Sequence, residues 1–285
     1  MQKNIIQLYP VFLFIITLLV YILFAGRLEF NFPTTIYNYF SFLAEAFLHG
    51  SIAFVSTPPF LHDLSTTADG KIYIYWGPAP TILIIPFITI FGRQLSDALY
   101  TAFIASTNPV FIYFLLNNLE KLNYIKIRNF HKMILCTFFA FGTVHFYLSV
   151  FGTVWFTSQI ISIFYLLSAL VLITQYAISK RLLILTFSSL LFALSVNSRA
   201  TLIVYAPLFI FFLLIAYSDL RKKMSKFLLA LGIFSFIFLL ILILNLFYNY
   251  LRFDSFFESG YASQHYAAHF AEDKEKYGFL NLAYI

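Results

Sequence analysis

The stretch TADGKIYIYWGPAP, residues 67–80, lies near the middle of a polar segment that covers residues 26–97. Apolar runs of membrane-spanning length stand on both sides of this segment, at about residues 5–25 and 98–116. We interpret the polar segment as a loop that a scaffold of transmembrane helices holds against the bilayer surface. If the protein carries out chemistry, we expect it in this loop.

Composition places the chain among membrane proteins. Of its 285 residues, 61% are hydrophobic and 11% are charged, whereas about 25% of the residues of a soluble domain are charged. Apolar runs of about 20 residues match the hydrocarbon thickness, whereas a β-barrel would show alternating segments of about ten residues. These features predict an all-α polytopic membrane protein. The 38 Phe and 20 Tyr residues would suit an aromatic-rich sugar binder, but a compositional bias that replaces Leu with Phe is the favoured explanation.

We expect one transmembrane domain, residues 1–285, with about seven membrane-spanning helices. Its expected parts are a first helix within 1–25, an extracytoplasmic loop at 26–97, further spans within 98–247 and an extracytoplasmic tail at 248–285. The spans are expected at about residues 5–25, 98–116, 133–150, 155–176, 182–196, 201–216 and 227–247. Because a polar stretch ends the sequence abruptly, we also expect the chain to continue past Ile285.

Basic residues predict the orientation in the membrane, because Lys and Arg concentrate in cytoplasmic loops. The basic residues cluster in the links 121–132, 180–181 and 221–226. These links share one side only if the apolar run 80–92 does not cross the bilayer. That run is too short to cross and Pro86 interrupts it, so it should lie in the interface or re-enter. The prediction is a multi-pass protein of the cell membrane, with a cytoplasmic N-terminus and an extracytoplasmic loop and tail.

The loop itself shows local patterns. Polar residues recur at helical spacing after Pro33 and stop at Gly50, which predicts an interfacial helix with a narrow polar stripe; the stripe is Asn38, Ser41, Glu45 and His49. Asp69-Gly70 is a common turn pair, and the alternating residues 71–76 after it are strand-like. Ser96-Asp97 is a suitable start for the next helix.

Several segments resemble one family when they are taken in chain order. The segments are FLHG (47–50), PPFLHDL (58–64), DGKIYIYWGPAPTILIIPFITIFG (69–92), FGTVWFTSQI (151–160), NSRATLIVYAP (197–207) and NYLRFDSFFESGY (249–261). Together they resemble the GT-C superfamily of polyprenyl-phosphate-dependent glycosyltransferases, the family 39-like group that includes protein O-mannosyltransferases and lipid A aminoarabinose transferases. The resemblance covers nearly the whole chain.

This resemblance implies an inverting sugar transfer at the extracytoplasmic face. The donor would be a sugar on polyprenyl phosphate, a loop carboxylate would be the general base, and cationic groups would hold the phosphate. The implied partners are the lipid-linked donor, membrane lipids and an acceptor glycan, lipid or protein, with no nucleic acid. No cofactor is certain. His49 and His62 lack a third ligand in pattern, so no metal site is predicted, although a divalent ion remains an open question.

The catalytic base is the point at which the sequence departs from the family. The family usually has Asp at a position that corresponds to about Thr35, where this chain has no carboxylate. The candidates are Glu29, Asp63 and Asp69. Glu29 is nearest in the chain to that position but could pair with Arg27, and Asp69 is better explained as a turn former.

The candidates for substrate binding are Lys71, Tyr75, Arg93, Arg199 and Arg252, of which the four cations would hold the phosphate. His145, in an expected span, is either a packed histidine or a member of the site. The alternatives to an enzyme are a non-catalytic GT-C-like subunit and a lipid-linked saccharide transporter. The spans contain few ionisable residues, which argues against transport.

Overall fold

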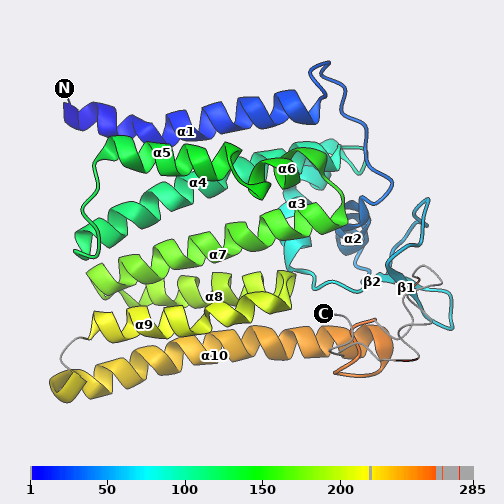
Figure 1. The fold of residues 1–285 in the computed structure, drawn as a ribbon. Coiled ribbons are helices and arrows are strands. Elements are labelled where there is room, and N and C mark those ends of the chain that lie inside the picture. The colour runs from blue at the N-terminus through cyan, green and yellow to red at the C-terminus, as the bar shows by residue number, and fades with distance from the viewer. Residues whose placement is uncertain (1, 218–219, 261–264, 266–275, 277–285) are drawn as a thin grey trace.

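The computed structural model describes residues 2–217, 220–260, 265 and 276, and helices that run side by side dominate it (Figure 1). The helices of the first half are α1 (Gln2–Ala25), α2 (Tyr39–Leu48), α3 (Ala79–Phe91), α4 (Asp97–Lys121), α5 (Asn129–Phe141) and α6 (Val144–Phe151). Those of the second half are α7 (Val154–Ser179), α8 (Leu182–Ser198), the 3-10 helix η1 (Ala200–Tyr205), α9 (Ala206–Ala216) and α10 (Leu220–Phe253). The predicted helical class is confirmed.

Four helices in the described part of the chain, α1, α4, α7 and α10, are long and apolar enough to cross a membrane. The pair α5 and α6 would add a fifth span if the two are counted together. The helices at the expected fifth and sixth spans are shorter than 18 residues, although they lie beside α7 and α10 in Figure 1. The chain is therefore a helical membrane protein with four or five candidate spans, and the prediction of about seven is confirmed only in part.

The span expected at 133–150 is broken. α5 ends before Gly142, α6 begins after Thr143, and the two helices meet at 53°. The Thr143 hydroxyl accepts a hydrogen bond from the backbone N–H of His145 at 3.2 Å, so it caps the start of the new helix. The Tyr21 hydroxyl donates to the carbonyl oxygen of Ala140 at 2.9 Å and lies 3.1 Å from Nδ1 of His145, which fastens both halves of the break to α1.

One expectation for the loop helices needs correction. α3 continues through Pro86 instead of being interrupted there, since a proline removes one hydrogen bond without always ending a helix. The polar stripe predicted at α2 is partly buried, because Asn38 and Ser41 are buried. Their side chains join the Tyr100 hydroxyl of α4, and this contact packs α2 onto the bundle.

Helix α10 is longer than the expected span at 227–247. It continues to Phe253, so that Asn249 and Arg252 of the expected tail at 248–285 belong to a helix. Most of the rest of that tail, residues 261–264, 266–275 and 277–285, lies outside the described residues. The expected span at 201–216 begins with the 3-10 turn η1 before α9. The longer α10 places polar residues at the end of a helix next to the loop.

The turn predicted at Asp69-Gly70 is confirmed as the tip of a hairpin. β1 (Leu64–Thr66) pairs antiparallel with β2 (Ile72–Ile74), and Gly70 has φ +77°, which favours glycine. Figure 1 shows this hairpin, α2 and the C-terminal part of α10 at the same end of the bundle, which we call the loop end. The side of the membrane that the loop end faces remains a prediction.

Asp97 ties three distant segments together at the loop end. It is only 1% exposed, and its carboxylate accepts hydrogen bonds from the backbone N–H of Thr35 at 3.0 Å, from the Thr35 hydroxyl, and from the backbone N–H of Thr153 at 2.9 Å. The residue before Thr153 must be small, because a Cβ on Gly152 would lie 2.8 Å from the backbone nitrogen of Ala98. Ser96 stands at the N-cap as expected, but its hydroxyl donates to the carbonyl oxygen of Pro33 instead of capping the helix.

Candidate functional site

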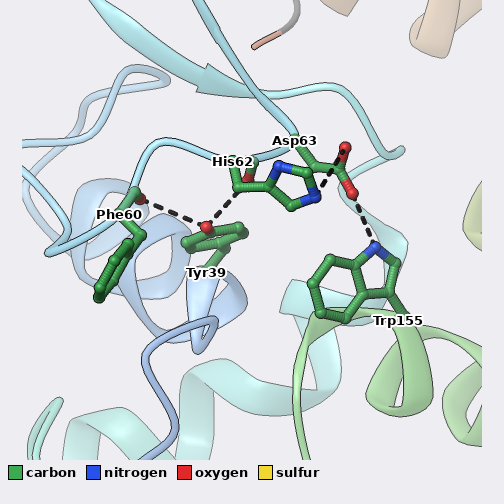
Figure 2. Close-up of polar contacts among 5 residues, drawn as sticks. All are labelled: Tyr39, Phe60, His62, Asp63 and Trp155. Atoms are coloured by element: carbon green, nitrogen blue, oxygen red, sulfur yellow. Dashed lines mark hydrogen bonds and ion pairs between the residues drawn. The ribbon is translucent and has the colours of Figure 1, made fainter. Parts of the chain in front are cut away.

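Trp155, the second residue of α7, connects a loop carboxylate with an arginine at the loop end. Its indole Nε1 donates to Oδ2 of Asp63 at 2.9 Å, as Figure 2 shows. Its carbonyl oxygen accepts a hydrogen bond from Nη2 of Arg199 at 3.1 Å. One residue therefore holds the candidate base and a candidate phosphate ligand on its two sides.

Asp63 is fixed in an exposed loop by several contacts. Its φ of 61° is a left-handed conformation that aspartate tolerates better than most residues. Its backbone N–H donates to the carbonyl oxygen of His265 at 2.8 Å, and Nε2 of His62 lies 3.9 Å from its Oδ1. The side chain is 16% exposed, so the carboxylate is held in place and still reaches solvent.

The segment that carries Asp63 is fastened to α2 by Tyr39. The Tyr39 hydroxyl donates to the carbonyl oxygen of His62 at 2.9 Å and lies 3.3 Å from that of Phe60 (Figure 2). Burial raises the pKa of the Tyr39 phenol, with smaller contributions from Tyr37 and Asp63, so the hydroxyl keeps the proton that it donates. The loop around Asp63 is therefore pre-organised by the scaffold.

A cavity of about 350 Å³ lies at the loop end between the link before α3, the C-terminal end of α8, and α10. Its polar part is lined by Tyr75, Asn197, Arg199, Asn245, Asn249 and Arg252, among others. Its apolar part follows α8 and α10 through Ala193, Val196, Phe238, Ile241 and Leu242. The cavity is thus amphipathic, with a cationic head at the loop end and an apolar wall along two helices.

Arg252 is the most deeply buried cation of this cavity, at 4% exposure. Its guanidinium donates from Nη1 to the carbonyl oxygen of Ile74 and from Nη2 to Oδ1 of Asn249 at 2.7 Å, and it lies over the ring of Tyr248 at 4.1 Å. Its buried Nε has no hydrogen-bond partner, and none of the ion pairs among the described residues includes it. Glu258 is a carboxylate that acts on this guanidinium electrostatically without forming an ion pair with it among the described residues. A buried cation without a close counter-ion is unfavourable, so an anion in direct contact with Arg252 would be attracted.

Asn197 builds the wall between the cavity and α3. Its Oδ1 accepts a hydrogen bond from the backbone N–H of Ala79 at 2.9 Å, and its Nδ2 donates to Oδ1 of Asn245 at 2.7 Å. Gly77 packs so closely that an added Cβ would lie 2.1 Å from the carbonyl oxygen of Asn197. These contacts hold α3, α8 and α10 in one arrangement around the cavity.

The structure brings several of the predicted residues together. Tyr75, Arg199 and Arg252 line the cavity, and Asp63 is linked to it through Trp155 without lining it. Tyr75 stacks on Trp76 with ring centroids 3.8 Å apart. Sequence reasoning did not select Trp155 or the three amides of the cavity as site residues. Polar residues at the ends of otherwise apolar helices are the signal that could have indicated the amides.

The other predicted residues lie elsewhere. Glu29 is exposed in a turn after α1, and the ion pair with Arg27, its alternative role, is not among those of the described residues. Asp69 and Lys71 form an exposed ion pair of 2.7 Å in the hairpin turn. The Lys71 ammonium and the Thr67 hydroxyl lower the pKa of Asp69 to about 2, which makes it a poor general base near neutral pH.

Arg93 is occupied by contacts of its own. It pairs with Glu45 at 3.0 Å and lies over the ring of Phe42 at 4.3 Å, so it fastens α2 to the segment after α3. His145 is 5% exposed and lies within 3.0 Å of Nδ2 of Asn108, which fits a packed histidine in the bundle. Within the part of the chain that the structure describes, no group of three His, Cys, Asp or Glu residues could hold a metal ion, which leaves the question of a divalent ion open.

A carboxylate from elsewhere in the chain lies beside Thr35. Thr35 is hydrogen-bonded to Asp97, which comes from the start of α4. Because this carboxylate is buried and accepts three hydrogen bonds, it is placed to hold the fold and not to meet an acceptor.

Comparison of the chain with protein-family models, with curated proteins and with solved structures finds no match.

Proposed function

We propose that the chain is an integral membrane glycosyltransferase that transfers a sugar, with inversion, from a polyprenyl-phosphate donor to an acceptor hydroxyl. The observation that carries this proposal is the amphipathic cavity, in which the buried guanidinium of Arg252 forms no ion pair with a carboxylate of the described residues. The resemblance of several loop and helix segments to the GT-C superfamily supports the same function.

The donor would lie with its phosphate at Arg199 and Arg252 and its isoprenoid chain along α8 and α10. A volume of about 350 Å³ is within the usual range of about 300–1,000 Å³ for ligand pockets. Phosphate suits arginine because the guanidinium presents several donors in a planar fork. In this placement the sugar would point towards Trp155, the residue that is hydrogen-bonded to both Arg199 and Asp63.

Asp63 would act as the general base. It would accept the proton of the acceptor hydroxyl while the hydroxyl oxygen forms a bond to the anomeric carbon. The bond from that carbon to the phosphate oxygen breaks, and the phosphate leaves with the electron pair. The two arginines would stabilise the charge that develops on the leaving group. The proton then passes from the Asp63 carboxyl to water, which restores the base.

The experiment is transfer by the full chain in lipid nanodiscs, with a panel of labelled sugars on polyprenyl phosphate. Asp63→Asn should lower the transfer rate by about 10²–10⁴-fold, the usual contribution of a general base. Asp69→Asn and Glu29→Gln are matched controls that remove other loop carboxylates and should stay within about twofold of wild type, as is usual for surface changes.

Two results would contradict the proposal. Equal rates for Asp63→Asn and wild type would remove the assigned base. Polyprenyl phosphate that binds, with no transfer from any donor of the panel, would instead favour a non-catalytic subunit or a lipid-linked saccharide transporter.

A further inference from the structure

Four rings lie together at the loop end, and two of them, those of His62 and Trp155, are next to Asp63. We call Tyr37, Phe60, His62 and Trp155 the aromatic wall. The ring centroid of Tyr37 lies 4.8 Å from that of Trp155 and 6.3 Å from those of Phe60 and His62. Phe60 is 49% exposed and the His62 side chain 42%, while Tyr37 and Trp155 are half-buried. The wall therefore presents ring surface to solvent beside a carboxylate.

The wall is held in place by backbone and side-chain hydrogen bonds. The backbone N–H of Val154 donates to the carbonyl oxygen of Tyr37 at 3.1 Å, which sets this ring beside Trp155. The Tyr39 hydroxyl holds the carbonyl oxygen of His62, and Asp63 holds the indole N–H (Figure 2). Rings that are fixed before a ligand arrives lose little conformational freedom on binding.

We infer that the aromatic wall binds a saccharide acceptor, so that the acceptor of the proposed transfer is a carbohydrate hydroxyl. This inference rests on the proposed function. The C–H face of a pyranose ring is apolar and packs against aromatic rings, while its hydroxyl groups need directional hydrogen-bond partners. The wall supplies both, since the Asp63 carboxylate and the His62 imidazole lie at its edge.

A cation is the competing ligand for rings beside a carboxylate, because quaternary ammonium groups bind to aromatic faces. The saccharide is favoured because the Asp63 carboxylate already accepts a hydrogen bond from the indole N–H of Trp155. A neutral ligand can pack against the rings without needing an ion pair with this carboxylate. Choline therefore belongs in the test as the discriminating probe.

The test uses tryptophan fluorescence of the purified full chain in nanodiscs without donor. The chain has two tryptophans, Trp76 and Trp155, and only Trp155 belongs to the wall. Titration with methyl α-mannoside, methyl β-galactoside and methyl β-N-acetylglucosaminide should give a saturable change with at least one of them. The change should persist in Trp76→Phe and vanish in Trp155→Phe.

Two further variants test the wall itself. Phe60→Ala, at a half-exposed position that should not disturb folding, should weaken glycoside binding by about tenfold, as removal of an aromatic contact commonly does. Phe257→Ala removes an aromatic ring that is 89% exposed and outside the wall, and it should bind the glycoside like wild type. Saturable binding of choline without binding of any glycoside would overturn the inference, and so would no response to any probe.

Kinetics separate this inference from the proposed function. If transfer occurs, Phe60→Ala should raise KM for the acceptor and leave KM for the donor unchanged. Transfer with an unchanged acceptor KM, and without glycoside binding, would refute the wall and leave the function standing. Glycoside binding without transfer from any donor would refute the function and leave the wall standing.

Discussion

Among substitutions at the loop end that add one methyl group, Gly77→Ala should disturb the packing of the cavity wall most. A Cβ at this position would lie 2.1 Å from the carbonyl oxygen of Asn197 and 2.6 Å from its Oδ1, whereas ordinary contacts begin at 3.4 Å. The carbonyl oxygen is backbone, so it cannot move aside as a flexible side chain would. The methyl group must therefore displace the end of α8 or the segment before α3.

The expected loss in the free energy of unfolding has two contributions. Overpacking of one methyl group against fixed backbone costs about 1–3 kcal/mol. Displacement of Asn197 also breaks its hydrogen bond with the backbone N–H of Ala79, which contributes about 1 kcal/mol. The expected loss is about 2–4 kcal/mol, which corresponds to a fall of roughly 5–15 °C in the apparent unfolding temperature.

The assay is thermal unfolding of the full chain in nanodiscs at a fixed heating rate, because membrane proteins often unfold irreversibly. Gly232→Ala is the matched control, since a Cβ there meets nothing within 4 Å and alanine is the better helix former. Polyprenyl phosphate should bind more weakly to Gly77→Ala than to Gly232→Ala. If Gly77→Ala unfolds at the same temperature as wild type and binds polyprenyl phosphate with the same affinity, the described packing of the cavity wall is wrong.

Three other changes test the scaffold. Asp97→Asn replaces an acceptor of three hydrogen bonds by a group with one oxygen, and it should cost about 1–3 kcal/mol in thermal unfolding; an unchanged melting temperature would exclude the proposed tie. Thr143→Ala removes the cap of α6 and should cost about 1 kcal/mol, whereas Thr186→Ala, at a half-buried site whose hydroxyl donates to the carbonyl oxygen of Leu182 within α8, should cost less than half of that. The Asp69–Lys71 pair should protect the hairpin amides from hydrogen exchange above about pH 4 and lose this effect as the pH falls towards 2, because Lys71 lowers the pKa of Asp69. If the hairpin amides of Asp69→Asn are as well protected from hydrogen exchange as those of wild type at neutral pH, after correction for intrinsic exchange rates, the ion pair does not stabilise the hairpin.

Hydropathy predicted the long helices because it depends on composition, which a single segment contains. Hydropathy did not predict the break at Gly142 and Thr143 for the same reason. Both helices at the break are apolar, and together they have the length of one membrane span. The turn at Asp69-Gly70 was predicted correctly because its geometry depends on adjacent residues. The helices and the turn that the sequence predicted correctly are therefore those that depend on residues close together in the chain.

The features that the sequence did not predict depend on contacts between residues far apart in the chain. Asp97 was interpreted as part of a helix start, but its partners Thr35 and Thr153 lie 62 and 56 residues away. The choice among three loop carboxylates stayed open because the indole N–H that marks Asp63 comes from a residue 92 positions later. Neither relation leaves a periodic or compositional trace that a single sequence could show.

Buried charges give the strongest physical reason to place an anionic ligand at the cavity. Three charged side chains of the described residues are almost completely buried: Asp97, Lys132 and Arg252. The first accepts three hydrogen bonds, and the second pairs with the carboxylate of Glu120 and the amide of Asn117. Arg252 differs, because carbonyl and amide oxygens satisfy only part of its guanidinium and its Nε has no hydrogen-bond partner. Glu258 acts on this guanidinium electrostatically but forms no ion pair with it among the described residues. A phosphate in contact with Arg252 would supply the close negative charge and the hydrogen-bond acceptors that are missing there, so the donor assignment depends more on Arg252 than on any other residue.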